Sequence, residues 1–386
     1  MNKSMLFIAL AGLLLASSCV KEDVPYQNKE QKSIIGFDSP TVVSGVSTKA
    51  NVYGEITGTY SYGTTAQYKY PREQNFKIYA VEHVGDFTAW SAATPTEFDE
   101  TSLSHDPSID GWAPTYIDAA GVEHYYYWDK TKKMSFAALS PADLENGGIS
   151  ASYGDDGHTI GNYVMPEDLT KHYDLMYSNR IVNQTSANMI EDASQYYGIP
   201  LEFNHALSSI HFSLKNETIA KVILTKITLL NIKSRGTFKE NLGSADPAGW
   251  SDVSVPVNVT PFEGTAEFPV TARYVTDIIK TEVPIDPNDK SNYVLAIPQE
   301  LGTGVGCVQL HVEYTVNGSA SSTTVNLSDY YTSPVSGTGV QIKEWEKGNR
   351  YTYRLVYTEG SALKDIIAFA PTTVDWNPID VIVIPL

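Results

Sequence analysis

Apolar and polar residues alternate in short runs along most of this chain. The runs Phe76–Val81, Ile210–Leu214 and Tyr351–Tyr357 place every second residue on one face. Alternation with a period of two residues is typical of a strand with one buried face. No convincing long amphipathic helix is evident, and residues 181–197 could hold only a short one. The pattern therefore predicts an all-β chain.

Apolar runs with turn signals add further strands. Lys133–Leu139 is predicted as a strand in the first half of the chain. In the second half, Val308–Val316 is followed by Asn317-Gly318, a strong signal for a hairpin turn. Thr323–Leu327 is the natural partner strand of that hairpin.

The predicted strands fall into two groups. Long polar stretches at 83–123 and 141–172 separate the strands of the first half, and we expect them to be loops. The pattern shifts near residue 198, after which strand-like runs continue to the end of the chain. We therefore expect two consecutive β-sandwich domains, 50–198 and 199–386.

Residues 1–18 have the features of a bacterial export signal. Lys3 provides a positive charge, residues 5–16 form an apolar segment, and small residues precede Cys19. The ending resembles a lipobox, which implies cleavage before Cys19 and acylation of this cysteine. The apolar segment is too short to span a bilayer as a helix, which takes about 20 residues, so we expect a lipid anchor. The alternative is a plain signal peptide followed by an incidental cysteine.

Residues 19–33 are polar, which favours a flexible tether. Within it, Lys21-Glu22-Asp23 resembles the export signal of Bacteroidetes lipoproteins, which sends them to the outer face of the outer membrane. We therefore expect a surface-exposed lipoprotein of the cell outer membrane before any further processing.

Composition excludes some classes of partner. The 386 residues carry a formal net charge of −18, which argues against nucleic acid and against anionic membranes bound by charge. Cys307 is the one cysteine besides Cys19, so no intrachain disulfide is expected. Hydrophobic packing must then hold the fold together.

Motifs for catalysis or metal binding are lacking in the sequence. His205 and His211 are six residues apart with no third ligand nearby, so His205 is expected to be a packed core residue. The glycine cluster 302–306 lacks the following helix that a phosphate loop needs. We expect no enzymatic activity, no metal and no cofactor.

Several short motifs occur in an order that resembles one protein family. They are Met134–Pro141, Asp174–Tyr177, Pro200–Leu207, Ala296–Gln299 and Trp345–Tyr353. On these residues the chain resembles the fimbrillin family of Bacteroidales, whose members form type V pili and include Mfa-like surface lipoproteins. The resemblance covers nearly the whole chain and implies two transthyretin-like β-sandwich domains in tandem.

The resemblance also implies a route of assembly. A trypsin-like protease removes the lipid and a first β-strand from family members, and the C-terminal strand of another subunit fills the groove that opens. Here the removable part would be residues 34–49, with its strand in Ile34–Val46 and the cut between Lys49 and Ala50. Donor and groove lie at different places on the subunit, so contacts would be head-to-tail and produce open filaments. The alternative for Lys49 is a solvated loop lysine.

The end of the chain, Val374–Leu386, is the expected donor strand. In an extended chain its residues alternate between two faces, and both faces are apolar. An uncovered run of this kind would aggregate, so it needs a partner. The partner is either a neighbouring subunit or the chain's own second domain. The donor residues are Val374, Trp376, Ile379, Val381, Ile382, Val383 and Ile384.

Two other roles on the same fold stay open. A tip adhesin or glycan-binding surface lipoprotein would use exposed rings as sugar platforms, and Trp90, Trp112 and Trp250 are the candidates unless each caps a core. A pilus anchor would keep its lipid and remain uncut at Lys49. The expected partners are other pilus subunits, a processing protease and a host glycan or protein receptor. The expected location is the fimbrium on the outer membrane surface.

Overall fold

The computed structural model describes residues 34–42, 59–62, 65–70, 74–108, 111–144, 148–188, 190–191, 197–244, 248–268, 283–284, 294–330, 341–358 and 377–385. Strands make up nearly all of their regular structure, so the predicted all-β class is confirmed. Short 3₁₀ helices are formed by Leu169–Lys171, Ser186–Asn188 and Leu327–Asp329.

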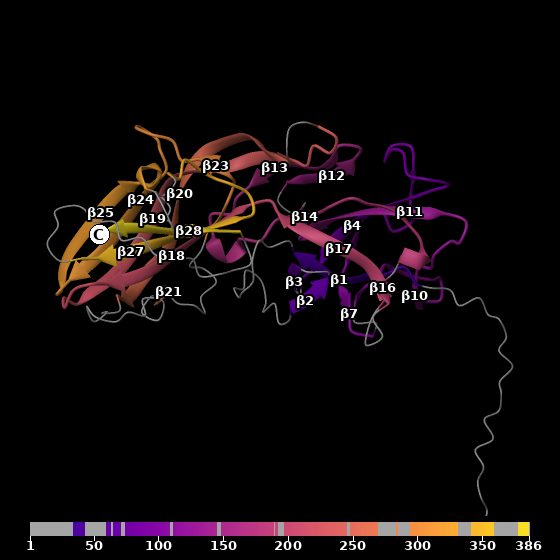
Figure 1. Ribbon diagram of the computed structural model, residues 1–386, viewed down its shortest axis with the longest axis horizontal. Coiled ribbons are helices and arrows are strands. Elements are labelled where there is room, and N and C mark those ends of the chain that lie inside the picture. The colour runs from indigo at the N-terminus through magenta and orange to yellow at the C-terminus, as the bar shows by residue number, and fades with distance from the viewer. Residues whose placement is uncertain are drawn as a thin grey trace, which may run out of the picture. The chain divides into compact units, whose positions relative to one another are not determined.

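The first sheet gathers its strands mainly from the first half of the chain. They are β1 (Phe37–Val42), β2 (Thr59–Tyr62), β3 (Thr65–Lys69), β4 (Phe76–His83), β5 (Thr94–Pro95), β6 (Thr101–Leu103), β7 (His105–Asp106), β8 (Gly111–Trp112), β11 (Lys133–Ser140), β14 (Met176–Ser178), β15 (Ile181–Gln184), β16 (Ile190–Glu191) and β17 (Tyr197–His205). The main path runs β2-β3-β1-β17-β14-β11-β4-β5 (Figure 1). β1 therefore lies inside this sheet and not at its edge.

Two further sheets, built mostly from the second half of the chain, form a sandwich. One contains β12 (Ser150–Gly154), β13 (Gly157–Val164), β19 (Val222–Lys239), β20 (Gly249–Glu267), β24 (Gln309–Val316) and β25 (Ser319–Asn326). The other contains β18 (Ser208–Asn216), β21 (Val283–Pro284), β22 (Val294–Ala296), β27 (Asn349–Tyr357) and β28 (Asn377–Pro385). Their orders are β12-β13-β19-β24-β25, with β20 along β19, and β21-β18-β27-β28, with β22 on β18.

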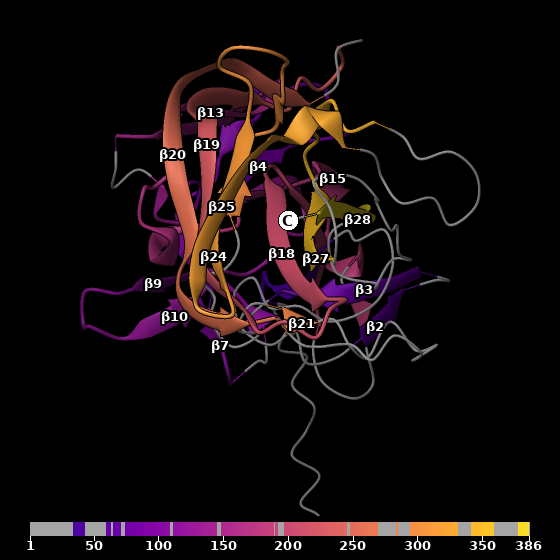
Figure 2. The same cartoon turned by 90° about the vertical axis from the view of Figure 1, so that its left-hand side faces the viewer.

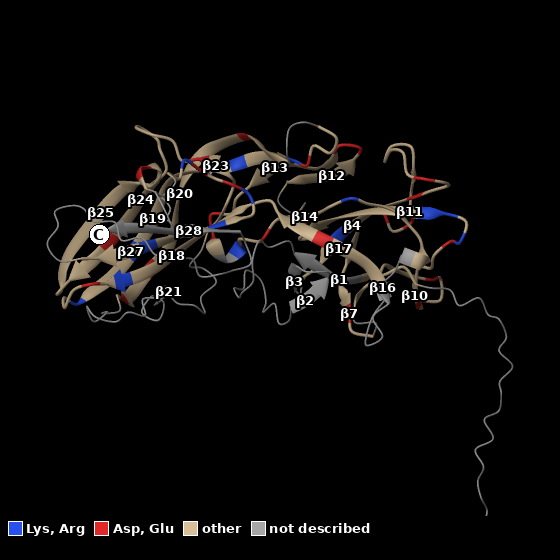
Figure 3. Cartoon of the chain, viewed as in Figure 1, with Lys and Arg blue, Asp and Glu red and all other residues tan. Residues whose placement is uncertain are grey.

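Two small ribbons complete the regular structure of the described residues. They are the hairpin of β9 (Thr115–Ile117) with β10 (Glu123–Tyr125), and the pair of β23 (Gln299–Glu300) with β26 (Glu344–Trp345). Acidic and basic residues are spread over many strands and loops (Figure 3). Within the described ranges, the structure contains no helix that is long and apolar enough to cross a membrane.

Strand alternation divides the buried side chains between two core clusters. On β4, Ile78 and Ala80 belong to an aromatic cluster of the first sheet, whereas Tyr79 and Val81 belong to a larger cluster. The larger cluster also unites both sheets of the second half. β4 therefore contributes side chains to both cores.

Strand pairing crosses the predicted domain boundary in both directions. The boundary at 198 falls inside β17, which pairs with β1 and β14 of the first sheet. The hairpin β12–β13 precedes the boundary but pairs with β19, where Ile160 lies opposite Phe238. The prediction of a loop over 141–172 is therefore wrong for this hairpin. Residues 181–197 contain β15, a 3₁₀ turn and β16 in their described part, in place of the short helix considered.

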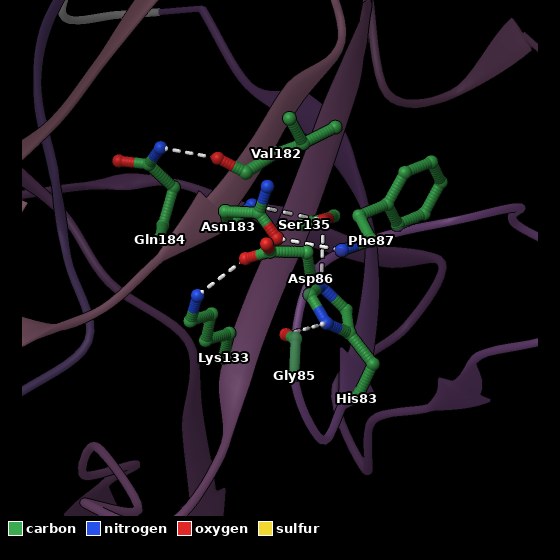
Figure 4. Close-up of polar contacts among 9 residues, drawn as sticks. All are labelled: His83, Gly85, Asp86, Phe87, Lys133, Ser135, Val182, Asn183 and Gln184. Carbon is green, nitrogen blue, oxygen red and sulfur yellow. Dashed lines mark hydrogen bonds and ion pairs between the residues drawn. The ribbon is translucent and has the colours of Figure 1, made fainter.

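A polar network fixes the end of β4 to β11 and β15 (Figure 4). His83 Nε2 and Ser135 Oγ form a hydrogen bond of 2.9 Å, and the Asn183 N–H donates to the same Ser135 oxygen at 3.3 Å. Asn183 Oδ1 accepts the Phe87 N–H at 2.7 Å. Asn183 has φ +60, a left-handed conformation that asparagine tolerates. The network holds the start of the loop that carries Trp90.

Candidate strand-exchange site

The predicted removable strand is an interior strand of the first sheet. β1 runs parallel to β17, with Phe37 opposite Ile199 and Val42 opposite Phe203. On its other side it runs antiparallel to β3, with Val42 opposite Tyr68. A strand that is paired on both sides has no free edge along those residues.

The residues just before and at the start of β1 are also held by the chain around the β9–β10 hairpin. Phe37 pairs with Trp112 of β8. The Ile35 N–H donates to the Tyr126 carbonyl at 2.9 Å, and Ile34 forms an antiparallel bridge with Tyr127. The removable segment therefore has backbone partners along its described length.

Ile35 and Phe37 anchor the segment in the aromatic core. Their side chains are 1% and 0% exposed. The Phe37 ring meets Phe136 edge to face with centroids 5.2 Å apart, and Phe76 at 6.3 Å. Burying one such side chain contributes about 1.5–3 kcal/mol, and each ring pair about 0.5–1.5 kcal/mol more. The segment is thus an integral part of this core.

Further rings surround the place that Phe37 occupies. Tyr70 stacks on Phe203 with centroids 5.0 Å apart and meets Trp112 edge to face at 5.8 Å. The Tyr70 hydroxyl lies 2.6 Å from Ser140 Oγ, and burial raises the pKa of Tyr70 above its ordinary value. Removal of Phe37 would leave a slot bordered by neutral aromatic rings.

The predicted donor segment lies at the edge of a different sheet. β28 runs parallel to β27, with Tyr351 opposite Ile379 and Leu355 opposite Ile384. The register shifts between Tyr351 and Tyr353, which interrupts a simple two-residue alternation. Within the described part of the chain, β27 is the one strand that pairs with β28. In this structure the tail is therefore folded back on its own chain, along β27.

β27 has support that does not depend on β28. Along its other edge it pairs with β18, where Ile210 lies opposite Tyr351. The Trp345 indole N–H donates to the Tyr353 hydroxyl at 2.9 Å, and Tyr353 and Leu355 are 0% exposed. Burial raises the pKa of Tyr351 to about 12.

The structure covers only some of the predicted site residues. Cys19, Lys49 and Ala50 lie outside the described residues, as do Val374 and Trp376. The other predicted donor residues lie on β28, namely Ile379, Val381, Ile382, Val383 and Ile384.

The three tryptophans proposed as a glycan platform occupy the core or its margin. Trp112 is 1% exposed and Trp90 is 8% exposed. Trp250 is half-buried, and its indole N–H donates to the Ala206 carbonyl at 2.6 Å. Trp90 and Trp112 therefore present no open ring face on which a sugar could stack.

Sequence reasoning missed a buried contact between His205, at the end of β17 in the first sheet, and Asp174. His205 Nδ1 and Asp174 Oδ2 are 2.7 Å apart, with side chains 5% and 6% exposed. Burial raises the pKa of Asp174, and the ion pair with His205 opposes that shift. The pairing of β14 with β17 brings the two residues together, since Met176 lies opposite His205. The prediction that His205 is a packed core residue is confirmed.

Metal-binding geometry is not found among the described residues. They contain no group of three or more His, Cys, Asp or Glu side chains that could hold an ion. Cys307 is buried, and its Sγ lies 3.2 Å from Asn326 Oδ1. The described side chains therefore form no candidate metal centre. The candidate strand-exchange site is defined by the backbone pairing of β1 and β28.

Comparison with models of known protein families finds one that matches this chain. A family model described as fimbrillin-like matches residues 72–376. No curated protein matches this chain. A fimbrial protein from Bacteroides vulgatus has a similar solved structure, with 16% identity, coverage of 84% of this chain and 94% of that chain, and a TM-score of 0.43. A structure from Bacteroides uniformis, provisionally assigned to cell adhesion, has 11% identity, coverage of 86% and 95%, and a TM-score of 0.43.

Proposed function

The chain belongs to the fimbrillin-like family, and on this premise we propose that it is a structural subunit of a type V fimbria. In this proposal the chain is exported as a lipoprotein acylated at Cys19 and is cut after Lys49 by a protease that accepts lysine. It then polymerises by donor-strand exchange with other pilus subunits. The resulting fimbrium extends from the cell outer membrane and serves adhesion.

The interior position of β1 is the observation that carries this proposal. A cut after Lys49 would release a strand that is paired with both β17 and β3. The backbone N–H and C=O groups of these two neighbours would then lack partners, and such strand edges readily add another strand. The places of Ile35 and Phe37 would supply apolar pockets for its side chains.

β28 has the properties of the strand that would fill this place. It is rich in Ile and Val, and it is nine residues long against six in β1. It runs parallel to β27 as β1 runs parallel to β17, so an exchanged β28 can keep the same polarity relative to its new neighbour. Its pairing with β27 supports a subunit that keeps its donor strand on its own chain until a groove opens on another subunit.

Protease treatment of the purified full-length chain tests the proposal. We expect trypsin to cut between Lys49 and Ala50 and multimer ladders to follow on unheated gels. Lys49→Ala should block both the cut and the ladder. A chain without residues 377–386 should be cut and stay monomeric. A synthetic peptide of residues 374–386 should occupy the open groove and shorten the ladders of the full-length chain.

Two outcomes would contradict this mechanism. Monomers that persist after complete cleavage at Lys49 would exclude protease-triggered exchange, and ladders from the truncated chain would exclude β28 as the donor. The N-terminus on native cells separates the roles within a pilus. A start at Ala50 supports a processed subunit, whereas a lipid-bearing Cys19 on every copy supports an anchor.

A further inference from the structure

The β9–β10 hairpin, which is labelled in Figure 2, carries several exposed apolar side chains. Tyr116 and Tyr127, each 44% exposed, are the exposed large aromatic residues of the described chain, and both belong to this region. Ile117 and Val122 are 72% and 51% exposed. Single exposed apolar residues are normal on a protein surface, but a cluster of them marks an interaction site.

Tyr116 belongs to a ladder of rings that leads from solvent to the core. Its ring stacks on His124 with centroids 5.3 Å apart and packs against Tyr126 at 5.0 Å. Tyr126 in turn lies 5.1 Å from Phe98, which is 3% exposed. Tyr116 and His124 are opposite each other in the hairpin register, so their rings share one face. Rings that are already held in place lose little conformational freedom when they bind a ligand.

Hydrogen bonds fix the turn next to this face. Asp118 Oδ1 accepts the N–H groups of Ala120 and Val122, both at 2.9 Å. His124 Nε2 lies 2.8 Å from Asp118 Oδ2, so an imidazole and a carboxylate stand beside the Tyr116 ring. Gly121 has φ +78, which the tight turn requires and which glycine adopts without strain.

The charge around the hairpin restricts the ligand. Residues 97–129 contain eight Asp and Glu residues and no Lys or Arg. A field of this sign repels anionic ligands such as sialylated or sulfated sugars. Carboxylates near the rings are engaged within the protein, Glu123 by Thr115 Oγ1 at 2.8 Å and Asp106 by the Tyr125 hydroxyl. Stacking on the Tyr116 ring needs no charge on the ligand, so a neutral ligand is the best fit to this face.

We propose that the Tyr116 face of the β9–β10 hairpin is a binding site for neutral carbohydrate. A pyranose has an apolar C–H face that stacks on an aromatic ring and a rim of hydroxyl groups that need donors and acceptors. Tyr116 supplies the ring, and His124 and Asp118 supply the polar groups at its side. The binding test uses the uncut chain, so its outcome is separate from that of the proposed assembly.

Binding to an immobilised panel of oligosaccharides tests the site. The probe is the full-length uncut chain, because Ile34 and Ile35 hold the base of the hairpin through Tyr126 and Tyr127. We expect retention of at least one neutral glycan and no retention of its sialylated counterpart. Tyr116→Ala should weaken that binding by about tenfold or more, and Tyr116→Trp should preserve it. Ile219→Ala is the control, since Ile219 is an exposed apolar residue outside the hairpin.

Thermal unfolding of each variant shows whether it is folded. Tyr116→Ala should keep one cooperative transition at a slightly lower temperature, because its side chain is partly in solvent and the contact between Tyr126 and Phe98 remains. The proposal is overturned if no neutral glycan is retained, if sialylated glycans are preferred, or if folded Tyr116→Ala binds as well as wild type. A hepta-arginine peptide is the counter-probe. Tyr116-dependent binding of this peptide in the absence of glycan binding would also overturn the proposal and identify a basic protein as the partner.

Discussion

β1 and β28 are the first and last described strands of the chain, and their sheets hold them in different ways. β1 pairs with β17 and β3 and lies beside the buried Ile35, whereas β28 pairs with β27 alone among the described strands. Releasing β1 breaks two backbone ladders and opens an aromatic core, but releasing β28 breaks one ladder. Under the proposed function, proteolysis supplies the covalent step that would free the place of β1. The tail needs no such step to leave its sheet.

Deleting each strand in turn should show the largest difference between β1 and β28. A chain without residues 34–42 should not reach a soluble native state, because it loses an interior strand together with its core side chains. A chain without residues 377–386 should stay soluble and keep most of its free energy of unfolding, since β18 still pairs with β27. Solubility and urea denaturation followed by circular dichroism measure both. A chain without residues 20–33 is the control, and equal losses from the two strand deletions would contradict the comparison.

A single substitution in the core should reproduce part of this contrast. Phe37→Ala should lower the free energy of unfolding by about 3–5 kcal/mol, because it leaves a cavity between Phe136 and Phe76. Val305→Ala is the control, since Val305 is fully in solvent and should change stability by less than about 0.5 kcal/mol. Denaturant midpoints with unchanged slopes measure the effect. A small loss for Phe37→Ala would show that β1 is held by its backbone more than by its core contacts.

The sequence could predict those strands whose pattern is local. The runs at Phe76–Val81 and Lys133–Leu139 became β4 and β11 because each is a short apolar-rich run next to polar stretches, although both strands are buried on both faces over most of their length. The Asn317-Gly318 turn is confirmed, with φ of +48 and +86, which are conformations that these two residue types favour. Each of these elements is determined by neighbours in the sequence.

Elements that depend on distant partners were not predictable in this way. β20 contains Pro256 and Pro261, which argue against a central strand in a sequence, although apolar and polar residues alternate over Val253–Val259. It becomes a strand by pairing with β19, and among the described strands it has no second partner, which is where proline is tolerated. The same limit applies to the candidate site. The apolar residues of Ile34–Val46 and Val374–Leu386 are visible in the sequence. The interior position of β1 and the edge position of β28 depend on sheet order, which the sequence pattern does not give.

Acid should weaken the body that carries both strands. His158 on β13 is 1% exposed and packs among rings that include Tyr153 at 4.5 Å, and burial lowers the pKa of His158 to about 3. Between the ordinary histidine pKa and this value, the unfolded chain binds a proton that the folded chain does not. Stability is therefore full above about pH 6.5 and falls as pH drops, by up to about 1.4 kcal/mol per pH unit. Denaturation midpoints over that range measure the slope.

Substitution isolates the contribution of this histidine. Burial also lowers the pKa of His172 and His211, so His158→Gln should reduce the acid slope by one proton and not abolish it. His311→Gln is the control, because the His311 side chain is 30% exposed. An unchanged slope in His158→Gln would assign the acid sensitivity to other groups. Acid should therefore lower the stability of the sheets that hold β1 and β28 alike, and it should not release one of the two strands selectively.

The smallest expected effect is on the buried thiol of Cys307. Cys307 is 3% exposed and precedes β24. β24 belongs to a different sheet from β27 and β28. In a chain that starts at residue 20, Cys307 is the sole thiol. Removing residues 377–386 should leave its reaction with a thiol reagent as slow as in the longer chain, because an edge strand can leave without opening the core. The guanidinium-unfolded chain gives the fast reference rate. Rapid labelling of the truncated chain would show that β28 is as integral to its core as β1, which would contradict a tail that is free to serve another subunit.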